Sequence, residues 1–308
     1  MATYLITGGT GLVGEALCEL LIRTGQHVII LTRNPDSFSP NTPLLSYRHW
    51  DPVKEQIDEL AIQQADYIIH LAGANVAEKR WTTQRKKEIV DSRVRSGRFL
   101  SNTLARIPNS VQAVIGASAQ GWYGPDPSVP NPNPFQETAP AFRDFLGSTC
   151  QLWEESLHPI KELGIRLITL RIGIVLSLKA GALAEFRKPL RWGISPVLGN
   201  GNQMISWIHI QDLVSLIDWS LKQEKISGVY NAAAPHPVSN RTLMRTLARA
   251  SRLPFVPIPV PTFFLKLILG EMSIEILKST TISVEKVQAA GFHFSFPEIE
   301  DALRDLLN

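Results

Sequence analysis

The stretch that decides the fold is Thr7-Gly8-Gly9-Thr10-Gly11-Leu12-Val13-Gly14, which follows the apolar run Tyr4-Leu5-Ile6. Gly8, Gly11 and Gly14 have the spacing of a dinucleotide-binding fingerprint at a turn from strand to helix. The first glycine permits a tight turn, the second lets a pyrophosphate approach the backbone, and the third lets the helix pack against the strand. The stretch predicts a phosphate site at a helix N-terminus, with a ligand-free turn as the alternative.

Strand-like and helix-like segments alternate through the first two-thirds of the chain. The predicted strands are residues 4–7, 27–32, 65–71, 111–117 and 166–172. The helical patterns are 13–24, roughly 84–104, and 142–163. Because apolar strands joined by helices form a parallel sheet with right-handed crossovers, the sequence predicts an α/β fold, a doubly wound parallel Rossmann sheet.

The remaining segments differ in composition from this pattern. Residues 124–140 contain six prolines and predict a loop, which beside a nucleotide site is often a lid. A strand-like run at 228–232 is followed by a helical pattern at 240–251 and a proline-rich stretch at 254–261. We expect residues 1–225 to form the nucleotide-binding domain, with small excursions after residue 173 contributing to a cap. Residues 226–308 are expected to form that small α-rich C-terminal cap, whose cleft holds substrate.

Composition excludes several classes of protein. The 308 residues carry a formal net charge of only +3, and basic residues cluster only at Arg85-Lys86-Lys87, so no nucleic-acid partner is expected. The two cysteines, Cys18 and Cys150, build neither a disulfide framework nor a metal site. The first strand begins too early for a signal peptide, and no apolar run spans a bilayer. We expect a cytoplasmic protein without a membrane partner, either a monomer or a homodimer, with a small-molecule substrate.

The end of the second predicted strand indicates which dinucleotide binds. An NAD site usually has an acidic residue there, but the strand ends Ile30-Leu31-Thr32-Arg33-Asn34. A guanidinium at Arg33 suits a 2′-phosphate, so NADP(H) is preferred over NAD(H), unless Arg33 is simply an exposed surface residue. After the strand that ends at His70, small residues let the cofactor approach, whereas His70 itself is expected to be packed. The expected cofactor contacts in the glycine turn are Gly8, Thr10, Gly11, Leu12, Val13 and Gly14.

Several stretches together resemble the extended short-chain dehydrogenase/reductase superfamily. They are Thr7–Gly14, Leu71-Ala72-Gly73, Ser118 to Gly124 and Trp207 to Asp212. More narrowly, the chain is similar to the atypical YfcH-type epimerase-family proteins. That match rests on Gly73 to Thr82 with Lys87 to Val94, Asp144 to Glu154, and Pro235–Asn240 with Leu269-Gly270-Glu271-Met272 and Ala289 to Phe292. The resemblance spans nearly the whole chain, including a C-terminal domain of unassigned function.

The resemblance implies further cofactor contacts. Thr32 and Arg33 would meet the adenosine phosphate, and Leu71 and Ala72 the adenine–ribose side, next to Gly73. Glu88 and Arg93 would approach the middle of the cofactor, although they could equally form an exposed helical pair. Leu176 would lie near the nicotinamide.

The chain departs from the superfamily at its catalytic pair. Ordinary members carry Tyr-x-x-x-Lys, in which the lysine lowers the pKa of the phenol so that it can move a proton. An alignment anchored on Glu154 puts Leu146 at the tyrosine and Cys150 at the lysine, and neither side chain does that work. Ser118 and Tyr123 are the substitute catalytic candidates. An alignment without a gap puts Ala119 in the serine position instead.

Other residues are candidates for the substrate cleft. Lys79, Arg80 and Trp81 lie in a loop expected above the nicotinamide and would grip an anionic or cyclic substrate. Trp207 and His209 come at the start of a helix, where His209 would line the cleft or cap structure. Two functions stay open: an NADP(H)-dependent oxidoreductase or epimerase for a small polar substrate, with a sugar derivative as one candidate, and a catalytically silent NADP(H)-binding redox sensor or regulatory protein.

Overall fold

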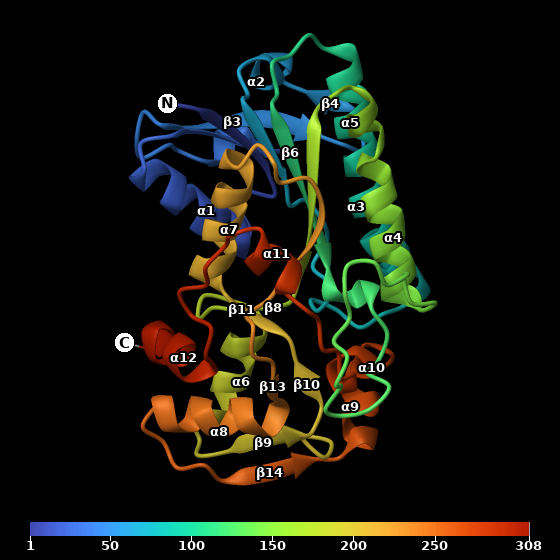
Figure 1. Ribbon diagram of the computed structural model, residues 1–308, viewed down its shortest axis with the longest axis vertical. Coiled ribbons are helices and arrows are strands. Elements are labelled where there is room, and N and C mark those ends of the chain that lie inside the picture. Colours follow the sequence, from blue (N-terminus) through green and yellow to red (C-terminus); the bar gives the residue numbers. More distant parts are fainter. Residues whose placement is uncertain (308) are drawn as a thin grey trace.

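An eight-stranded sheet forms the centre of the computed structural model, which describes residues 1–307 (Figure 1). The strand order is β12-β7-β6-β5-β1-β2-β3-β4, and every neighbouring pair is parallel except β3 and β4. The strands are β1 (Thr3–Thr7), β2 (His27–Thr32), β3 (Leu45–Asp51), β4 (Gln56–Ile57), β5 (Tyr67–His70), β6 (Ala113–Ala119), β7 (Arg166–Ile172) and β12 (Gly228–Ala232). The predicted doubly wound Rossmann sheet is confirmed.

Helices cover both faces of this sheet. One face carries α1 (Leu12–Arg23), α7 (Ile210–Lys222) and α11 (Glu285–Ala289). The other carries α2 (Glu59–Gln63), α3 (Thr83–Arg106), α4 (Phe145–Leu157) and α5 (Pro159–Glu162). Along β5, Ile68 packs with α3 and Ile69 with α1, because successive strand side chains point to opposite faces. The alternation buries both faces and holds the strand ends in fixed register.

A smaller cap lies beyond the carboxyl ends of the strands (Figure 1). Its elements are α6 (Ala182–Leu190), β9 (Ser195–Leu198), β10 (Met204–Ile205), β13 (Val238–Ser239), α8 (Asn240–Ala250), β14 (Pro257–Val260), α9 (Thr262–Leu269), α10 (Met272–Leu277) and α12 (Ile299–Leu307). Parallel strands β8 (Ile174–Leu176) and β11 (Trp207–His209) join it to the sheet domain. The cap has its own core, in which Leu183, Leu243 and Leu303 are fully buried.

The sheet does not end at the predicted boundary of residue 225. Strand β12 pairs in parallel with β7 and forms the edge of the main sheet, because the backbone groups of β7 need a partner on that side. Conversely, residues 174–205 supply much of the cap. The chain therefore crosses between the two parts several times, and a single cut at residue 225 does not describe the sheet.

Local predictions differ from the structure in two further places. Strand β3, with the sequence LSYRHWD, was not predicted because its side chains are mostly half-exposed and its apolar run is broken by Arg48 and His49. The helical pattern at 142–163 forms two helices, α4 and α5, because Pro159 lacks the N–H that a continuous helix requires.

The proline-rich loop at 124–140 is fixed at both ends rather than free. Asp126 accepts hydrogen bonds from the hydroxyls of Ser279 and Thr281, at 2.7 and 2.9 Å. The Phe135 N–H donates to the Thr281 carbonyl at 2.8 Å, and the Trp122 indole donates to the Ala139 carbonyl at 2.8 Å. The loop that the sequence predicted as a lid is therefore a brace between the sheet and segment 279–283.

Candidate functional site

The glycine turn between β1 and α1 shows which of its glycines the protein itself requires. Gly8 has a φ of +71°, and a Cβ there would lie 2.9 Å from the carbonyl carbon of Leu71. A Cβ at Gly14 would lie 2.5 Å from the carbonyl oxygen of Gly8. A Cβ at Gly11 would meet only that same oxygen, at an ordinary 3.4 Å. Packing thus explains the first and third glycines, whereas the second is exposed and has room for a Cβ.

Helix α1 begins at this turn without a side-chain cap. Gly11 is the N-cap residue, with φ −90° and ψ 173°, and no side chain accepts from the first N–H groups of the helix. Those groups have no partner within a helix, and the helix dipole adds positive potential there. These backbone N–H groups have no side-chain partner, and the small Gly11 leaves room beside them. Both features fit the diphosphate of a dinucleotide.

His70 forms the floor beneath this turn. Its Nδ1 lies 2.8 Å from the Thr7 hydroxyl and its Nε2 lies 3.2 Å from the Ser96 hydroxyl. The Thr7 hydroxyl also accepts from the Ala72 N–H at 3.3 Å. Complete burial lowers the pKa of His70 to about 4, so the ring is neutral at pH 7. His70 is a packed strand residue, as expected, and ties β1 and β5 to α3.

The structure brings together the residues predicted for the adenosine side. Thr32 and Arg33 follow β2, while Leu71, Ala72 and Gly73 follow β5, and both strands are direct neighbours of β1. Thr32, Leu71 and Ala72 are half-buried, and Gly73 and Arg33 are exposed. Within residues 1–307, Arg33 makes no ion pair. Its guanidinium is therefore exposed and not neutralised by an acidic side chain of this part of the chain.

The side chains of Glu88 and Arg93 have different surroundings: Glu88 is exposed, whereas Arg93 is packed against other residues. The exposed Glu88 carboxylate pairs with Arg85 at 2.8 Å along the helix. Arg93 donates to two backbone carbonyls, each 3.0 Å away, and its guanidinium lies 4.8 Å from the ring centre of Trp153. A Cβ at Gly73 would lie 3.1 Å from the Arg93 Cζ, so Arg93 borders the glycine that follows β5. Burial lowers the pKa of Arg93 to about 10, and it stays charged at pH 7.

Three further candidates, Leu176, Trp207 and His209, are fully buried, and His209 takes the capping role that the sequence predicts as its alternative. Leu176 is fully buried in the cap core. The Trp207 indole donates to the His236 carbonyl at 3.0 Å. His209 caps α7 by accepting from the Gln211 N–H at 3.1 Å. Trp207 and His209 do not line a cleft, because the join between β8 and β11 encloses them.

The loop between β5 and α3 reaches the cap. Lys79 and Arg80 are exposed, and a Cβ at Gly270 would lie 3.3 Å from the Arg80 guanidinium. Lys86 forms an ion pair with Glu271. Trp81 is fixed by an indole hydrogen bond of 2.8 Å to a backbone carbonyl and by the edge of a neighbouring ring. Arg80 therefore stands where the sheet domain meets the turn between α9 and α10, and the exposed Lys79 precedes it in the same loop.

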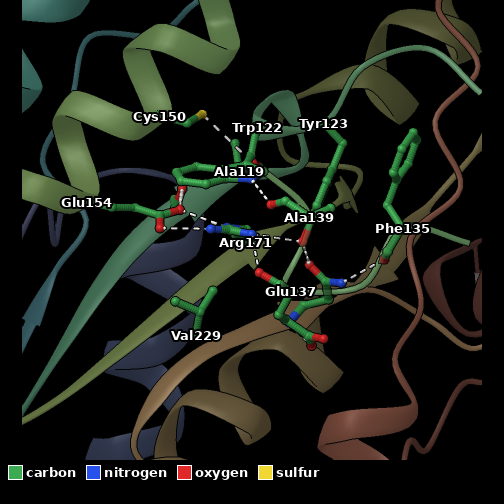
Figure 2. Close-up of polar contacts among 12 residues, drawn as sticks. Ala119, Trp122, Tyr123, Phe135, Glu137, Ala139, Cys150, Glu154, Arg171 and Val229 are labelled. Carbon is green, nitrogen blue, oxygen red and sulfur yellow. Dashed lines mark hydrogen bonds and ion pairs between the residues drawn. The ribbon is translucent and has the colours of Figure 1, made fainter. Parts of the chain in front are cut away.

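A buried ion pair occupies the corner between β7 and α4 (Figure 2). Arg171, on β7, meets both carboxylate oxygens of Glu154, on α4, at 2.9 and 3.1 Å. Their side chains are only 3% and 5% exposed. Ser118 donates to the same carboxylate at 2.6 Å. The guanidinium also lies 3.5 Å from the ring centre of Trp122. Burial alone lowers the pKa of Arg171, but the hydrogen bonds and charge of Glu154 raise it overall.

Tyr123 belongs to the same buried network. Its hydroxyl donates to Asn231 at 2.7 Å and accepts from Arg171 at 3.1 Å. Arg171 and Asn231 each also contact the backbone or side chain of Glu137 in the brace loop. Burial raises the pKa of Tyr123 to about 12, against the opposing effect of Arg171. The phenol therefore stays protonated at pH 7, and both it and Ser118 are engaged in internal hydrogen bonds.

Leu146 and Cys150 flank this network on α4. A Cβ at Gly121 would lie 3.1 Å from the Leu146 Cβ, so Leu146 packs against the short turn after β6. The Cys150 thiol lies 3.8 Å from the Ala119 carbonyl (Figure 2). Burial raises the pKa of Cys150 to about 11, which keeps it a thiol at pH 7.

Sequence reasoning used Glu154 only to align the chain and did not identify its pair with Arg171. One signal was present: Arg171 follows the buried and mostly apolar run 167–170 near the end of β7. A charge in such a strand requires a partner. Nothing local identified that partner, which comes from a different helix.

Within residues 1–307, no helix combines the length and apolarity needed to cross a membrane. Nor does this part of the chain gather three or more His, Cys, Asp or Glu residues in a metal-binding cluster.

Comparisons with known proteins agree with this architecture. Residues 4–233 match the family model described as NAD dependent epimerase/dehydratase family, and residues 260–306 match a domain of unknown function, DUF1731. An epimerase family protein of Staphylococcus aureus (strain MRSA252) is 36% identical over 308 residues, covering 100% of both chains.

Solved structures show the same likeness. Human epimerase family protein SDR39U1 (isoform 2), solved with NADPH, has a TM-score of 0.86 at 25% identity, covering 99% of both chains. UDP-glucuronic acid 4-epimerase from Bacillus cereus, solved with UDP-glucuronic acid and NAD, has a TM-score of 0.79 at 18% identity. It covers 99% of this chain and 98% of its own, and this second likeness concerns the fold alone.

Proposed function

The chain belongs to the NAD dependent epimerase/dehydratase family, and from that membership we propose that it is an NADP(H)-binding oxidoreductase or epimerase. The observation that carries the proposal is the glycine turn, where uncapped N–H groups stand beside an exposed Gly11. NADP(H) supplies or accepts a hydride when bound. The chain's own residues bind its diphosphate, orient it against the ends of β5 and β1, and recognise its 2′-phosphate.

The preference for NADP(H) rests on Arg33. The end of β2 carries Thr32, Arg33 and Asn34 rather than a carboxylate that would bind a ribose 2′-hydroxyl, and the exposed Arg33 has no ion-pair partner within residues 1–307. Its forked donors match a phosphate in charge and geometry. A human relative solved with NADPH supports this preference.

The proposed substrate is small and polar, with a sugar derivative as one candidate. It would lie between the end of β6 and the cap, where Arg80 approaches the turn between α9 and α10 and the exposed Lys79 precedes it in the same loop. These two cations suit an anionic group on the substrate. Ser118 and Tyr123 are engaged in the buried network, and we propose that they position the wall of this cleft rather than transfer a proton themselves.

Cofactor preference is tested by titrating NADPH and NADH, followed by fluorescence, against Arg33→Ala. Loss of charge-assisted hydrogen bonds should weaken NADPH binding about tenfold to a hundredfold and leave NADH binding unchanged. Arg23→Ala, an exposed arginine on α1, is the matched control. Equal NADPH affinities for the wild type and Arg33→Ala would show that the 2′-phosphate argument is wrong.

A silent NADP(H)-binding redox sensor or regulatory protein is the second candidate. The observation in its favour is the buried Glu154–Arg171 pair, which leaves Ser118 and Tyr123 without free hydroxyl protons. One experiment distinguishes the enzyme from the silent sensor. The protein is incubated with NADPH deuterated at the nicotinamide 4-position and with a panel of carbonyl compounds and nucleotide sugars. Label in a product identifies an enzyme, whereas NADPH binding without label transfer favours the sensor.

A further inference from the structure

Helix α9 and the start of α10 expose an unusual number of large apolar side chains. Phe263, Phe264, Leu267, Ile268 and Ile274 are between 46% and 67% exposed, and only Leu265 of α9 is fully buried. On α9 the exposed residues recur at spacings of one, three and four, so they form one stripe along the helix. We call these five residues the apolar stripe. A stripe of this kind marks a surface that meets an apolar partner.

A second stripe on the cap is cationic. Helix α8 contains no acidic residue, and Arg241, Arg245 and Arg249 are exposed at intervals of four along one face. None of the three makes an ion pair within residues 1–307, nor does the exposed Lys266 of α9. A surface helix normally relieves such like charges with acidic neighbours. This arginine stripe therefore presents uncompensated positive charge.

The helices that carry the two stripes both begin beside the turn at residues 199–201, at the end of the cap. Arg241 donates to the Asn200 carbonyl at 3.4 Å, and its N–H donates to Gly201 at 2.9 Å. In the same turn a Cβ at Gly199 would lie 3.5 Å from the Thr262 side chain, at the start of α9. Figure 1 shows α8, β14 and α9 together at the end of the molecule farthest from β3 and β4.

Charge is distributed unevenly between the two parts of the chain. Segments 177–205, 236–278 and 299–307, which build the cap, contain eleven Lys or Arg residues and six Asp or Glu residues, a net charge of +5. Since the whole chain carries +3, the remainder carries −2. The cap end is attracted to an anionic surface, and the sheet domain is repelled by it.

We propose that the cap docks on an anionic lipid bilayer, with the apolar stripe inserted at the boundary between headgroups and acyl chains. Such interfacial binding needs an apolar helix face flanked by basic residues, and it does not need a helix that spans the bilayer. Lys266 lies within the stripe, and its long side chain reaches the headgroups while its methylene groups stay among the apolar residues. The arginine stripe contacts lipid phosphates beside it.

Charge and apolar character also argue against two alternative partners for this end of the cap, a second copy of the chain and nucleic acid. A second copy of the chain would bring two caps of net charge +5 together, which like-charge repulsion opposes. Nucleic acid would suit the arginines, but it offers no hydrocarbon for Leu267, Ile268 and Ile274. A bilayer with anionic headgroups satisfies both stripes.

The test is flotation of the full-length protein with phosphatidylcholine vesicles, with and without phosphatidylglycerol. The wild type should bind the anionic vesicles about tenfold more tightly than the neutral ones, and added salt should weaken this binding. Leu267→Ser with Ile268→Ser, and separately Arg245→Glu with Arg249→Glu, should each reduce binding about tenfold. All four positions are exposed, so both variants should fold.

Matched controls come from the sheet domain. Leu60→Ser removes an exposed apolar side chain, and Lys54→Glu with Arg98→Glu reverses two exposed charges, and both should bind vesicles as the wild type does. The proposal is overturned if the wild type binds neither vesicle, or if the Leu267→Ser/Ile268→Ser variant binds as the wild type. A wild-type dimer by light scattering that becomes a monomer in that variant, without vesicle binding, also overturns it. So does tight binding to duplex DNA in place of vesicles.

Discussion

The glycine turn and the Glu154–Arg171 corner lie at the same edge of the sheet but treat polar groups in opposite ways. At the turn, the first N–H groups of α1 have no side-chain acceptor, and Gly11 is exposed with room for a Cβ. At the corner, the Glu154 carboxylate accepts hydrogen bonds from the Ser118 hydroxyl and the Arg171 guanidinium. The guanidinium also donates to the Tyr123 hydroxyl. The turn is built to receive a partner, and the corner is already complete.

This difference teaches where to expect chemistry and where to expect stability. Unpaired donors cost little at an exposed turn, because water replaces the ligand when it leaves. A buried charge that loses its partner destabilises the folded protein, because no water molecule takes the partner's place. Changes at the corner should therefore affect folding, and changes at the turn should affect binding.

The largest expected effect comes from breaking the corner. Glu154→Gln leaves the Arg171 guanidinium buried without its counter-charge and should lower the free energy of unfolding by about 3–5 kcal/mol. Urea denaturation followed by fluorescence measures this change. Glu155→Gln, at an exposed neighbouring carboxylate, is the control. A loss of less than about 1 kcal/mol would show that the corner behaves like a surface ion pair.

Acid should destabilise the folded chain through His70, which lies beneath the glycine turn. The pKa of His70 is about 4 in the folded chain, below its ordinary 6.5, so the unfolded chain binds more protons between these values. Stability should be fully present above pH 6.5 and fall as the pH drops towards 4, by on the order of 3 kcal/mol. His70→Gln should flatten this dependence in denaturation curves measured across that range. His27→Gln, at an exposed histidine, should not.

Within the turn, two glycines should respond differently. Gly14→Ala places a Cβ against the Gly8 carbonyl and should cost about 1–3 kcal/mol of stability. Gly11→Ser should leave stability within about 0.5 kcal/mol, because serine is a good N-cap, yet weaken NADPH binding about tenfold. The serine hydroxyl would accept from the N–H groups proposed to bind the phosphates. Unchanged NADPH affinity in Gly11→Ser would contradict that proposal.

The smallest effect is expected at Tyr123. Tyr123→Phe removes the donor to Asn231 and one acceptor of Arg171, which should cost about 1–2 kcal/mol. NADPH affinity should not change, because the hydroxyl faces the buried network rather than the turn. Denaturation and NADPH titration of the same preparation check both parts. A large loss of NADPH affinity without loss of stability would place Tyr123 in the ligand site instead.

Much of the sheet domain could be predicted from the chain because its signals are local. The strands at 27–32, 166–172 and 228–232 have the predicted limits, since each is a continuous apolar run bounded by turns. Strand β3 escaped prediction because it is half-exposed and lacks such a run. The brace loop resembles a lid in composition, and only its contacts with segment 279–283 show that it is fixed.

The candidate site divides in the same way. The glycine turn was predicted from spacing, and Arg33 and the small residues after β5 from their places at strand ends, because each of these signals lies within a short stretch of chain. Ser118 and Tyr123 were identified, but their partners lie 36 and 108 residues away. No local pattern connects residues at such separations. Their engagement in a buried network became visible only in the folded chain.

The sequence by itself determined the doubly wound sheet and the dinucleotide turn, because hydrophobic period and glycine spacing act over a few residues. Tertiary structure decided that Arg171 meets Glu154, that β12 completes the sheet, and that α8 and α9 begin beside the same turn of the cap. These outcomes depend on which distant elements pack together. A buried charge or an unpaired strand edge needs a partner, but the choice of partner belongs to the fold.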